Sequence, residues 1–503
     1  MVKNIRLLVQ RVQIYPCLGF ENGFLYEIAI MTSIFAPASH TFQTIETFGH
    51  RDDRGEGIQH NGFHSKTPEE ASAQLWRHSP GWPDKNGDHR YDVTYELRTP
   101  PADADKKPFN KTGFTAVGEN QRLQTRLSLQ SIEDVANVKF IEGPKTETSE
   151  GHLIIGNYGQ RFDSEGKSKP SHPHANMPSP RLIHGSAVWF VDKAGHRTVP
   201  DAALGNSGRY TLVHELGHAM GLSHAGHYNG NLDISKVSHH EDSRSHTVMS
   251  YRGERTGHIH HQGFWPSAPQ LDDIRALQDK YGVRHDTRND DTTYGFNSTT
   301  ERDFLSVTSA ADKIVAAIWD GGGIDTLDFS GYRQDQQLSL KAGTLSDVGG
   351  LKGNVSIAYG ALIENAIGGS GNDVLVGNEL ANTLKGGDGD DWLYGAEGAD
   401  TLWGGHGKDQ FVYGKISEST QAASDLIMDF VSGEDRVDVS GIRAALGRGP
   451  LKFVSAFSGA SAEAILSYDP VLHMSTLQIT GKHDEPTFVL QLNGRLQRSD
   501  IVG

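Results

Sequence analysis

The chain has 503 residues, more than one hydrophobic core usually supports, so two or three domains are expected. Its formal net charge of -16 is spread along the chain, which argues against nucleic acid or an anionic membrane as the main partner and favours cation binding. A single cysteine, Cys17, excludes an intrachain disulfide, and no apolar run reaches the roughly 18 residues of a membrane-spanning helix.

The first 65 residues mix glycine, histidine and charged residues without a period, and they are expected to form a largely unstructured leader or propeptide. Met31 is a candidate for the true start, which would make residues 1–30 an upstream addition. An ordered N-terminal segment is the alternative. Polar residues interrupt the apolar run near the N-terminus, so it makes a poor secretory signal.

Helix and strand signals begin at residue 67 and indicate a mixed domain. The stretch TPEE at 67–70 combines an N-cap, a first-turn proline and a capping-box glutamate, which predicts the start of a helix. Further helices are predicted over 119–135 and 207–221. Strands are predicted at YDVTYEL (91–97), VKFIE (138–142), HLIIGNY (152–158) and SAVWFV (186–191). These mixed elements predict an α+β or α/β domain.

The stretch HELGHAMGLSH has the spacing of a metal site. His214 and His218 lie four residues apart, so one helix face presents both to the same cation. Gly221 allows the helix to stop and the chain to turn back, so that His224 supplies a third ligand. Three imidazoles leave one position open, as in catalytic zinc sites, whereas structural sites are closed. Glu215 is then the candidate general base.

A methionine turn, SHTVMSY at 245–251, follows this HExxHxxGxxH motif. The two motifs together resemble the metzincin zinc metalloproteases. With the SAPQLDDIRALQDKYG helix that follows, the chain is similar to the serralysin family of secreted bacterial proteases from about residue 66 to the C-terminus. The resemblance implies an α+β metzincin-type catalytic domain at 66–283 that hydrolyses peptide bonds.

The resemblance also assigns roles to single residues. It implies one catalytic zinc on His214, His218 and His224, Glu215 as the catalytic acid/base, and Tyr251 as a switchable zinc ligand that stabilises the oxyanion. Trp189 lies in a segment similar to the family's substrate-binding edge strand, and a plain core aromatic is the alternative. Ala225 stands where the family usually has proline, and His227 is interpreted as outward-facing rather than as a competing ligand. His258, His260 and His261 are interpreted as part of a solvated loop, with a metal site as the alternative.

Residues 368–412 contain five nonapeptides of the form GGxGxDxUx: GGSGNDVLV, GNELANTLK, GGDGDDWLY, GAEGADTLW and GGHGKDQFV. Glycines allow tight turns with inward carbonyls, aspartates add hard oxygen ligands for calcium, and the apolar eighth residues predict a thin core. Asn382 replaces aspartate in the second repeat, so a weaker site is expected there. The candidate calcium ligands are Gly368, Gly369, Gly371, Asp373, Gly386, Gly387, Gly389, Asp391, Gly395, Gly398, Asp400, Gly404, Gly405, Gly407 and Asp409.

The resemblance implies an all-β parallel β-roll (RTX) domain at 284–503 with several structural calcium ions. Further calcium ligands are implied near the domain junction: the carbonyls of Arg288 and Asp290, then Thr292, Asp320, Gly322, Gly323, Asp325 and Glu364. Asp290 stands where the family tends to have glycine, which leaves the backbone geometry open. Export as an unfolded chain by a type I secretion machinery, directed by a C-terminal signal, is expected.

The expected protein is therefore a secreted, extracellular zinc endopeptidase that acts as a monomer on proteins and peptides. Neither nucleic acid nor stable membrane insertion is expected, and a proteinaceous inhibitor is left open. The rival from another class is a calcium-dependent adhesin with a dead metal site, against which the presence of Glu215 argues. A structural zinc protein would require Tyr251 to stay bound permanently.

Overall fold

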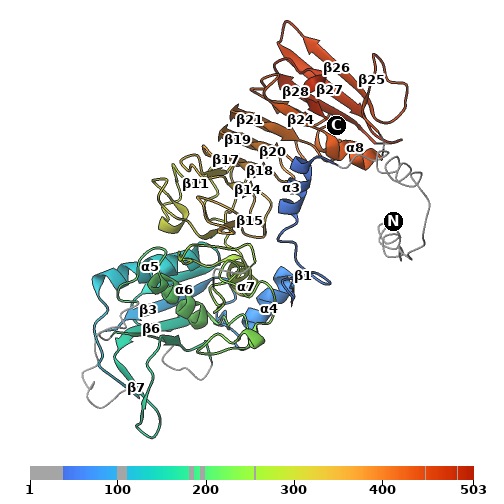
Figure 1. Cartoon of the computed structure of the whole chain (residues 1–503). Helices are drawn as coiled ribbons and strands as arrows, with labels where there is room; N and C mark the ends of the chain where they lie inside the picture. Colours follow the sequence, from blue (N-terminus) through green and yellow to red (C-terminus); the bar gives the residue numbers. More distant parts are fainter. Residues whose placement is uncertain are drawn as a thin grey trace, which may run out of the picture.

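The computed structural model describes residues 38–98, 110–179, 186–192, 199–253, 257–447, 449–483 and 485–503. Figure 1 shows an N-terminal region, residues 66–283, beneath a C-terminal region, residues 284–503. The expectations for residues 1–37, including the start at Met31, lie outside the described residues. Within the described ranges, no helix is both long and apolar enough to cross a membrane.

A five-stranded sheet in the order β5-β3-β6-β10-β9 forms the base of the N-terminal region. Its strands are β3 Tyr91–Leu97, β5 Val138–Glu142, β6 Gly151–Tyr158, β9 His174–Ala175 and β10 Ser186–Val191. All neighbours are parallel except β9, which is antiparallel to β10 and forms one edge. Two smaller sheets consist of β1 Gln59–His60 and β2 Phe63–His64, and of β4 Lys111–Thr112, β7 Gln160–Phe162 and β8 Ser168–Lys169.

The helices of this region are α4 Pro68–Trp76, α5 Glu119–Glu133, α6 Ser207–Met220 and α7 Leu271–Tyr281, with a 3-10 turn at Ile234–Lys236. The capping box predicted at 67–70 is present, since the Thr67 hydroxyl accepts the Glu70 N–H and the Glu70 carboxylate accepts the Thr67 N–H. Helix α6 packs on α5 and against β9 and β10. It ends at Gly221, whose φ of 108° is left-handed and favours glycine.

The regular secondary structure of the C-terminal region consists almost entirely of short β-strands. One ten-stranded sheet contains β11 Thr293–Gly295, β13 Thr326–Asp328, β17 Asn365–Ile367, β19 Thr383–Asp388, β21 Thr401–His406, β23 Asp425–Ile427, β28 Thr487–Asn493, β27 Met474–Thr480, β26 Glu463–Asp469 and β25 Lys452–Phe453. A six-stranded sheet contains β14 Gln337–Ser339, β18 Val374–Val376, β20 Trp392–Tyr394, β22 Gln410–Val412, β24 Arg436–Asp438 and β29 Ile501–Val502. A third contains β12 Ala316–Ile318, β16 Val355–Ile357 and β15 Leu345–Ser346, and the helical elements are α8 Ser440–Leu446 and 3-10 turns at Asp303–Leu305, Ile416–Glu418 and Arg498–Asp500.

The nonapeptides alternate between the two large sheets. Residues 18 apart therefore pair in parallel, as Leu375 does with Leu393 and Leu384 with Leu402. The apolar residue at the eighth position of every repeat is fully buried, including Phe411 in the last one. The thin apolar core expected from the repeat pattern is thus present.

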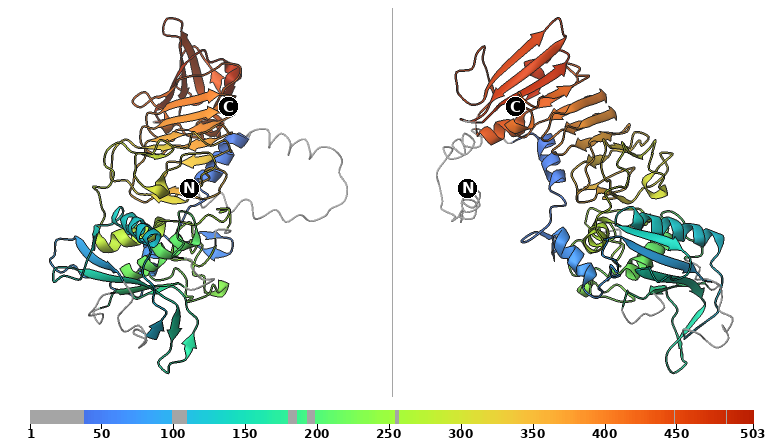
Figure 2. Two further views of the ribbon diagram at one scale, coloured as in Figure 1. Left: turned by 90° about the vertical axis from the view of Figure 1, so that its left-hand side faces the viewer. Right: turned by 180° about the vertical axis from the view of Figure 1, so that it is seen from behind.

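Residues 38–65 are folded, contrary to the expectation of a largely unstructured leader for this stretch. Helix α3, His40–Gly49, begins at Ser39, whose hydroxyl accepts the Phe42 N–H, and lies alongside the repeat strands in both views of Figure 2. Its apolar face joins a cluster on the outer side of the six-stranded sheet: Phe42, Ile45, Phe48, Val374, Val376 and Val412. The local sequence does not reveal this helix because its packing partners lie more than 300 residues away.

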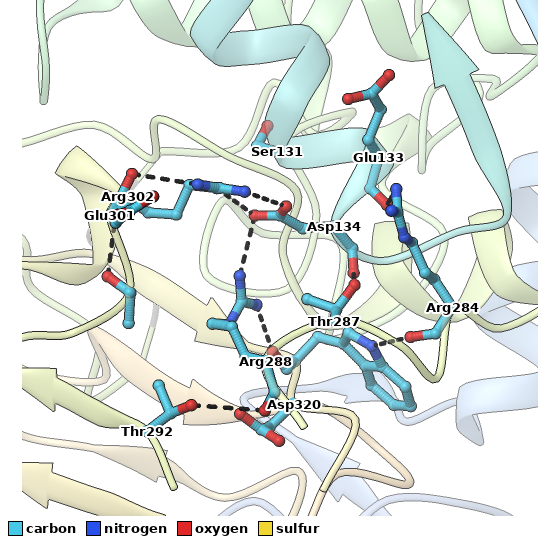
Figure 3. Close-up of polar contacts among 12 residues, drawn as sticks. Ser131, Glu133, Asp134, Arg284, Thr287, Arg288, Thr292, Glu301, Arg302 and Asp320 are labelled. Carbon is cyan, nitrogen blue, oxygen red and sulfur yellow. Dashed lines mark hydrogen bonds and ion pairs between the residues drawn. The ribbon is translucent and has the colours of Figure 1, made fainter. Parts of the chain in front are cut away.

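A charge cluster around the buried Asp134 joins the two regions (Figure 3). Asp134, directly after α5, accepts hydrogen bonds from Nε of Arg302 at 2.7 Å and from Nη1 of Arg288 at 3.1 Å. Its main-chain oxygen accepts the hydroxyl proton of Thr287 at 2.7 Å. Since α5 packs on α6, this cluster connects the C-terminal region to the helix that carries the histidine motif.

Candidate metal centre

The three predicted histidines converge. His214, His218 and His224 each offer one ring nitrogen, and these atoms all lie within 4.8 Å of one another. Burial lowers the pKa of His218 to about 4 and that of His224 to about 3, and it holds the pKa of His214 well below the ordinary range. All three rings are therefore neutral at pH 7, which is the form that binds metals.

Main-chain carbonyls orient the three rings. The Nδ1–H of His214 donates to the Val248 oxygen at 2.7 Å, and that of His218 donates to the Leu222 oxygen at 2.6 Å. His224 donates in the same way to the oxygen of Tyr228 at 3.1 Å. These bonds fix one tautomer and leave every Nε2 lone pair free for a cation. The donor set of three neutral imidazoles fits zinc.

Glu215 lies beside this centre without belonging to the ligand cluster. Its side chain is 6% exposed, and burial raises its pKa to about 8, while a hydrogen bond from the Ala175 main chain opposes that shift. Its Oε2 has no hydrogen-bond partner among the described residues. An unpartnered oxygen in a buried carboxyl group is suited to exchange a proton with a bound molecule.

Tyr251 and Met249 occupy the positions expected of the methionine turn. The Tyr251 ring centre lies 4.5 Å from that of His224 and 5.8 Å from that of His214, and its N–H donates to the Tyr228 hydroxyl at 3.1 Å. Burial raises the pKa of Tyr251, so its hydroxyl is protonated at neutral pH. Met249 is fully buried, and its side chain packs against helix α6 instead of occupying a ligand position.

A cleft of about 1140 Å³ opens over these residues and is lined by the three histidines, Glu215 and Tyr251. Its wall includes His174 and Ala175 of β9, the edge strand. The prediction that Trp189 lies on the edge strand is wrong. Trp189 belongs to β10, between β6 and β9, is 2% exposed and packs with Tyr158. The sequence around β9 is proline-rich and has no strand pattern, so the edge could not be identified from it.

The departures from the family pattern leave the triad intact. Ala225 is buried, and its N–H points to the Met249 carbonyl at 3.4 Å, a bond that proline could not make. His227 is exposed and lies outside the three-histidine cluster. His261 is fully buried beside the Ser245 hydroxyl, so the expectation of a solvated loop fails at this position.

The predicted calcium ligands near the junction also come together. Asp325 accepts the Thr292 N–H at 2.7 Å, and its own N–H donates to Glu364 at 2.8 Å. The Thr292 hydroxyl donates to the Asp290 carbonyl at 2.8 Å, and Gly322 N–H donates to Asp320 at 2.7 Å. Burial, followed by the negative charges of Asp320 and Glu364, raises the pKa of Asp325 to about 8. Such a cluster of carboxylates fits a cation.

In this junction site the backbone of Arg288 is left-handed, with φ 50°. Asp290 is not among the described residues with positive φ. The glycine usual at position 290 is therefore not needed here. Gly323, with φ 137°, brings the chain so close to the Asp290 carbonyl that an added Cβ would lie 2.7 Å from its oxygen. This close approach keeps the carbonyl in the site.

Aspartates form two ladders along the repeats. Each donates its N–H to Oδ1 of the aspartate that follows on the same side: Asp373 to Asp391 at 2.7 Å, Asp391 to Asp409 at 2.9 Å, and Asp400 to Asp425 at 2.9 Å. The Oδ2 atoms of Asp391, Asp400 and Asp409 are buried without a hydrogen-bond partner in the described part of the chain. Orphaned carboxylate oxygens in a row indicate cation sites.

The repeat glycines make room for these oxygens. A Cβ on Gly386 would lie 2.3 Å from Oδ2 of Asp391, and one on Gly404 would lie 2.2 Å from Oδ2 of Asp409. The remaining predicted glycines share this crowding, with an added Cβ within 2.6 Å of a carboxylate or carbonyl oxygen: Gly368, Gly369, Gly371, Gly387, Gly389, Gly395, Gly398, Gly405 and Gly407. Only Gly322 in the junction loop has open space there.

Asn382 differs from the aspartates as expected. Its Oδ1 accepts the Asn378 N–H at 2.8 Å, and its amide donates to the Glu364 carbonyl at 3.0 Å, so it offers no spare oxygen. Asp425 and Asp435, which the repeat pattern does not predict, end the two ladders. Asp435 does so by accepting the Asp409 N–H at 3.0 Å. Their spacing from the preceding aspartates departs from 18 residues, which hides them from a repeat search.

Similarity to known proteins covers both regions. The family described as Peptidase M10 serralysin C terminal matches residues 283–502. Metallopeptidase AprA of Pseudomonas marginalis is 43% identical over 475 residues, covering 93% of this chain and 97% of the relative. Serralysin C of Dickeya chrysanthemi is 40% identical over 481 residues, with 93% and 97% covered. Serralysin of Photorhabdus sp. (strain Az29) is 45% identical over 409 residues, with 80% and 82% covered.

Proposed function

Because the chain belongs to the serralysin family of zinc metalloendopeptidases, we propose that it hydrolyses peptide bonds of extracellular proteins at the centre formed by His214, His218 and His224. One observation carries this proposal: the Nε2 atoms of His218 and His224 lie 3.1 Å apart while both Nδ1 atoms are committed to carbonyls. Two lone pairs at this distance repel each other, and a cation bound between them would remove this repulsion.

When zinc is bound, it polarises the scissile carbonyl and lowers the pKa of an adjacent water. Burial alone raises the pKa of Glu215 to about 8, and the positive charge of a bound zinc would lower it again and leave the carboxylate ionised. Glu215 then accepts a proton from the attacking water and returns it to the leaving amine, a role supported by its burial and its unpartnered Oε2. The Tyr251 hydroxyl donates a hydrogen bond to the oxygen that gains negative charge. The edge strand β9 pairs with the main chain of an extended substrate and lies against Glu215 through Ala175.

Residues 66–283 form the catalytic domain, and residues 284–503 form a β-roll whose aspartate ladders and junction site hold several calcium ions. Carboxylates brought together in this way repel until cations neutralise them, and extracellular calcium modules bind with Kd values of about 10⁻⁴–10⁻³ M. The β-roll therefore folds where calcium is plentiful, after export of the unfolded chain through a C-terminal signal by a type I machinery. The segment removed on maturation lies within residues 1–65.

Casein hydrolysis tests the proposal. The purified protein in calcium should cleave casein, lose this activity when zinc is removed by a zinc-selective chelator, and regain it when zinc is restored. His218→Ala should not be rescued by zinc, whereas His473→Ala, a change at an exposed turn far from the centre, should behave as the wild type. Hydrolysis that persists without zinc would refute the proposal.

A further inference from the structure

The cleft over the metal centre is lined by more basic than acidic side chains, although the chain as a whole is acidic. Glu215 is the only carboxylate among the described residues that line it, against two arginines and several histidines. The first arginine, Arg77, is occupied, because its guanidinium donates to the carbonyls of Gln74 at 2.5 Å, His224 at 2.5 Å and Gly226 at 2.7 Å. Arg77 thus holds the loop that carries the third ligand, and Arg161 is the arginine left to face a substrate.

Arg161 comes from β7, at the centre of a three-stranded antiparallel sheet. Lys111 on β4 and Lys169 on β8 lie directly opposite it, so three cationic side chains form one row. Like charges in directly opposite positions destabilise a sheet. The row therefore has a cost that an anion bound beside it would offset.

The two lysines of this row have their own surroundings. The Lys169 ammonium is 3.2 Å from the Asp163 carboxylate. Lys111 is 7% exposed, and its ammonium lies 5.0 Å from the ring centre of Trp189 and 5.5 Å from that of Tyr158. Arg161 has no carboxylate partner in the described part of the chain. Its one side-chain partner there is Nε2 of His172, at 3.4 Å.

His172 is itself held in place at the cleft wall. Its N–H donates to the Tyr158 hydroxyl at 3.1 Å, and its carbonyl accepts that hydroxyl's proton at 2.7 Å. Its segment leads directly into β9, the edge strand. Arg161 and His172 consequently lie where the side chain of a peptide paired with β9 would pass, and most of the Arg161 guanidinium donors have no partner among the described residues.

We propose that Arg161 selects peptide substrates that carry an acidic side chain near the scissile bond, by a charge-assisted pair between its guanidinium and the substrate carboxylate. This inference rests on the proposed function, since it names a preference of the same cleft. Arginine forms bidentate pairs with carboxylates, so glutamate or aspartate is the class it would recognise.

The test uses full-length zinc- and calcium-loaded protein and a series of quenched fluorescent peptides. Each pair of peptides differs only by glutamate against glutamine at one position, from three residues before the scissile bond to three after it. The wild type should show a kcat/KM ratio of about ten in favour of glutamate at one position, a discrimination that corresponds to about 1.4 kcal/mol. Arg161→Gln should bring this ratio close to one, and Arg161→Glu should invert it. Lys169→Gln, which changes the neighbouring cation of the row, should keep it.

A second readout does not depend on how the variants fold. The wild-type ratio should fall as salt rises from about 0.01 M to about 1 M, since the Debye length drops from about 30 Å to about 3 Å. Cleavage without preference at any position, or a preference that Arg161→Gln leaves unchanged, would overturn this inference alone. No cleavage of any peptide by the loaded wild type would overturn the proposed function and this inference with it.

Discussion

His218 and His224 face each other through Nε2 atoms 3.1 Å apart, although neither nitrogen has a proton to donate. The Nδ1 proton of each ring is bound by a carbonyl of the loop after α6, at Leu222 and at Tyr228. The loop therefore holds two lone pairs against their mutual repulsion, and a cation between them would remove that cost. The loop after α6 thus fixes the positions of two of the three candidate ligand nitrogens.

Zinc affinity should respond weakly to mild acid. Protons compete with zinc only below the pKa of the ligands, and burial lowers the pKa of His218 to about 4 and that of His224 to about 3. Competition with a calibrated zinc chelator should give nearly the same affinity at about pH 7 and about pH 5. A zinc affinity that falls steadily as the pH drops below about 6.5, the ordinary pKa of histidine, would show that the rings titrate freely.

Gly217→Ala should damage the centre, although alanine usually stabilises a helix. A Cβ at this position would lie 2.7 Å from Sδ of Met249, so the helix and the methionine turn would have to move apart. Overpacking of this kind typically costs about 1–3 kcal/mol. The melting temperature of the N-terminal region and kcat/KM should both fall.

The double variant Gly217→Ala/Met249→Ala provides the control. Removing the sulfur makes room for the new methyl group, so the loss caused by Gly217→Ala should be smaller in the Met249→Ala background than in the wild type. Equal losses in both backgrounds would exclude this contact as the cause.

Calcium-free protein should hold its repeat structure better in acid than in base. Burial raises the pKa of Asp391 to about 8 and that of Asp400 to about 7, against an ordinary value of 3.8. Because the folded pKa is the higher one, the stabilisation is present at low pH and is lost as the pH rises through about 7 to 8. In chelator, circular dichroism should show more β-structure at about pH 5 than at about pH 8.

Two controls test whether the carboxylates cause this pH dependence. With saturating calcium the β signal should stay constant over the same range, because the cations neutralise the carboxylates. Asp391→Asn should raise the calcium-free melting temperature at about pH 8 and weaken calcium binding. A calcium-free signal that grows from acid to base would contradict the account.

Asp134→Ala should weaken the junction between the two regions. Removing this carboxylate leaves the partly buried guanidinium groups of Arg288 and Arg302 without their common partner. Breaking a buried ion pair on one side costs about 3–5 kcal/mol. Calorimetry should show the two regions melting further apart, with faster proteolysis of the 283–293 connection. An unchanged thermogram would mean that the cluster does not couple the regions.

Short-range patterns were sufficient for much of this molecule. The capping box at Thr67 predicts where α4 begins, and the spacing of His214, His218 and His224 predicts the metal cluster. Both depend on contacts within a few residues of the chain, which are set by helix geometry and, for His224, by the turn at Gly221. The stacked leucines of the repeats follow from periodicity in the same way.

Features that depend on distant partners were missed or misplaced. Helix α3 is defined by packing on strands that lie far along the chain, and β9 has only two residues, so neither has a local pattern. Trp189 lies inside the sheet and not at its edge, because this short strand pairs with β10. Asp425 and Asp435 close the ladders at irregular spacing, so only their hydrogen bonds identify them.

In the proposed reaction, hydrolysis depends on zinc, and Glu215 transfers the proton from the attacking water to the leaving amine. The most direct test of this reaction measures zinc content and casein hydrolysis together in the wild type and in Glu215→Gln, which keeps the side chain's shape. We expect one zinc per chain in both proteins. The variant alone should lose at least a hundredfold in its rate of casein hydrolysis, which corresponds to an increase of about 2.7 kcal/mol or more in the activation free energy. A variant that retains its zinc and cleaves casein at the wild-type rate would contradict this role of Glu215.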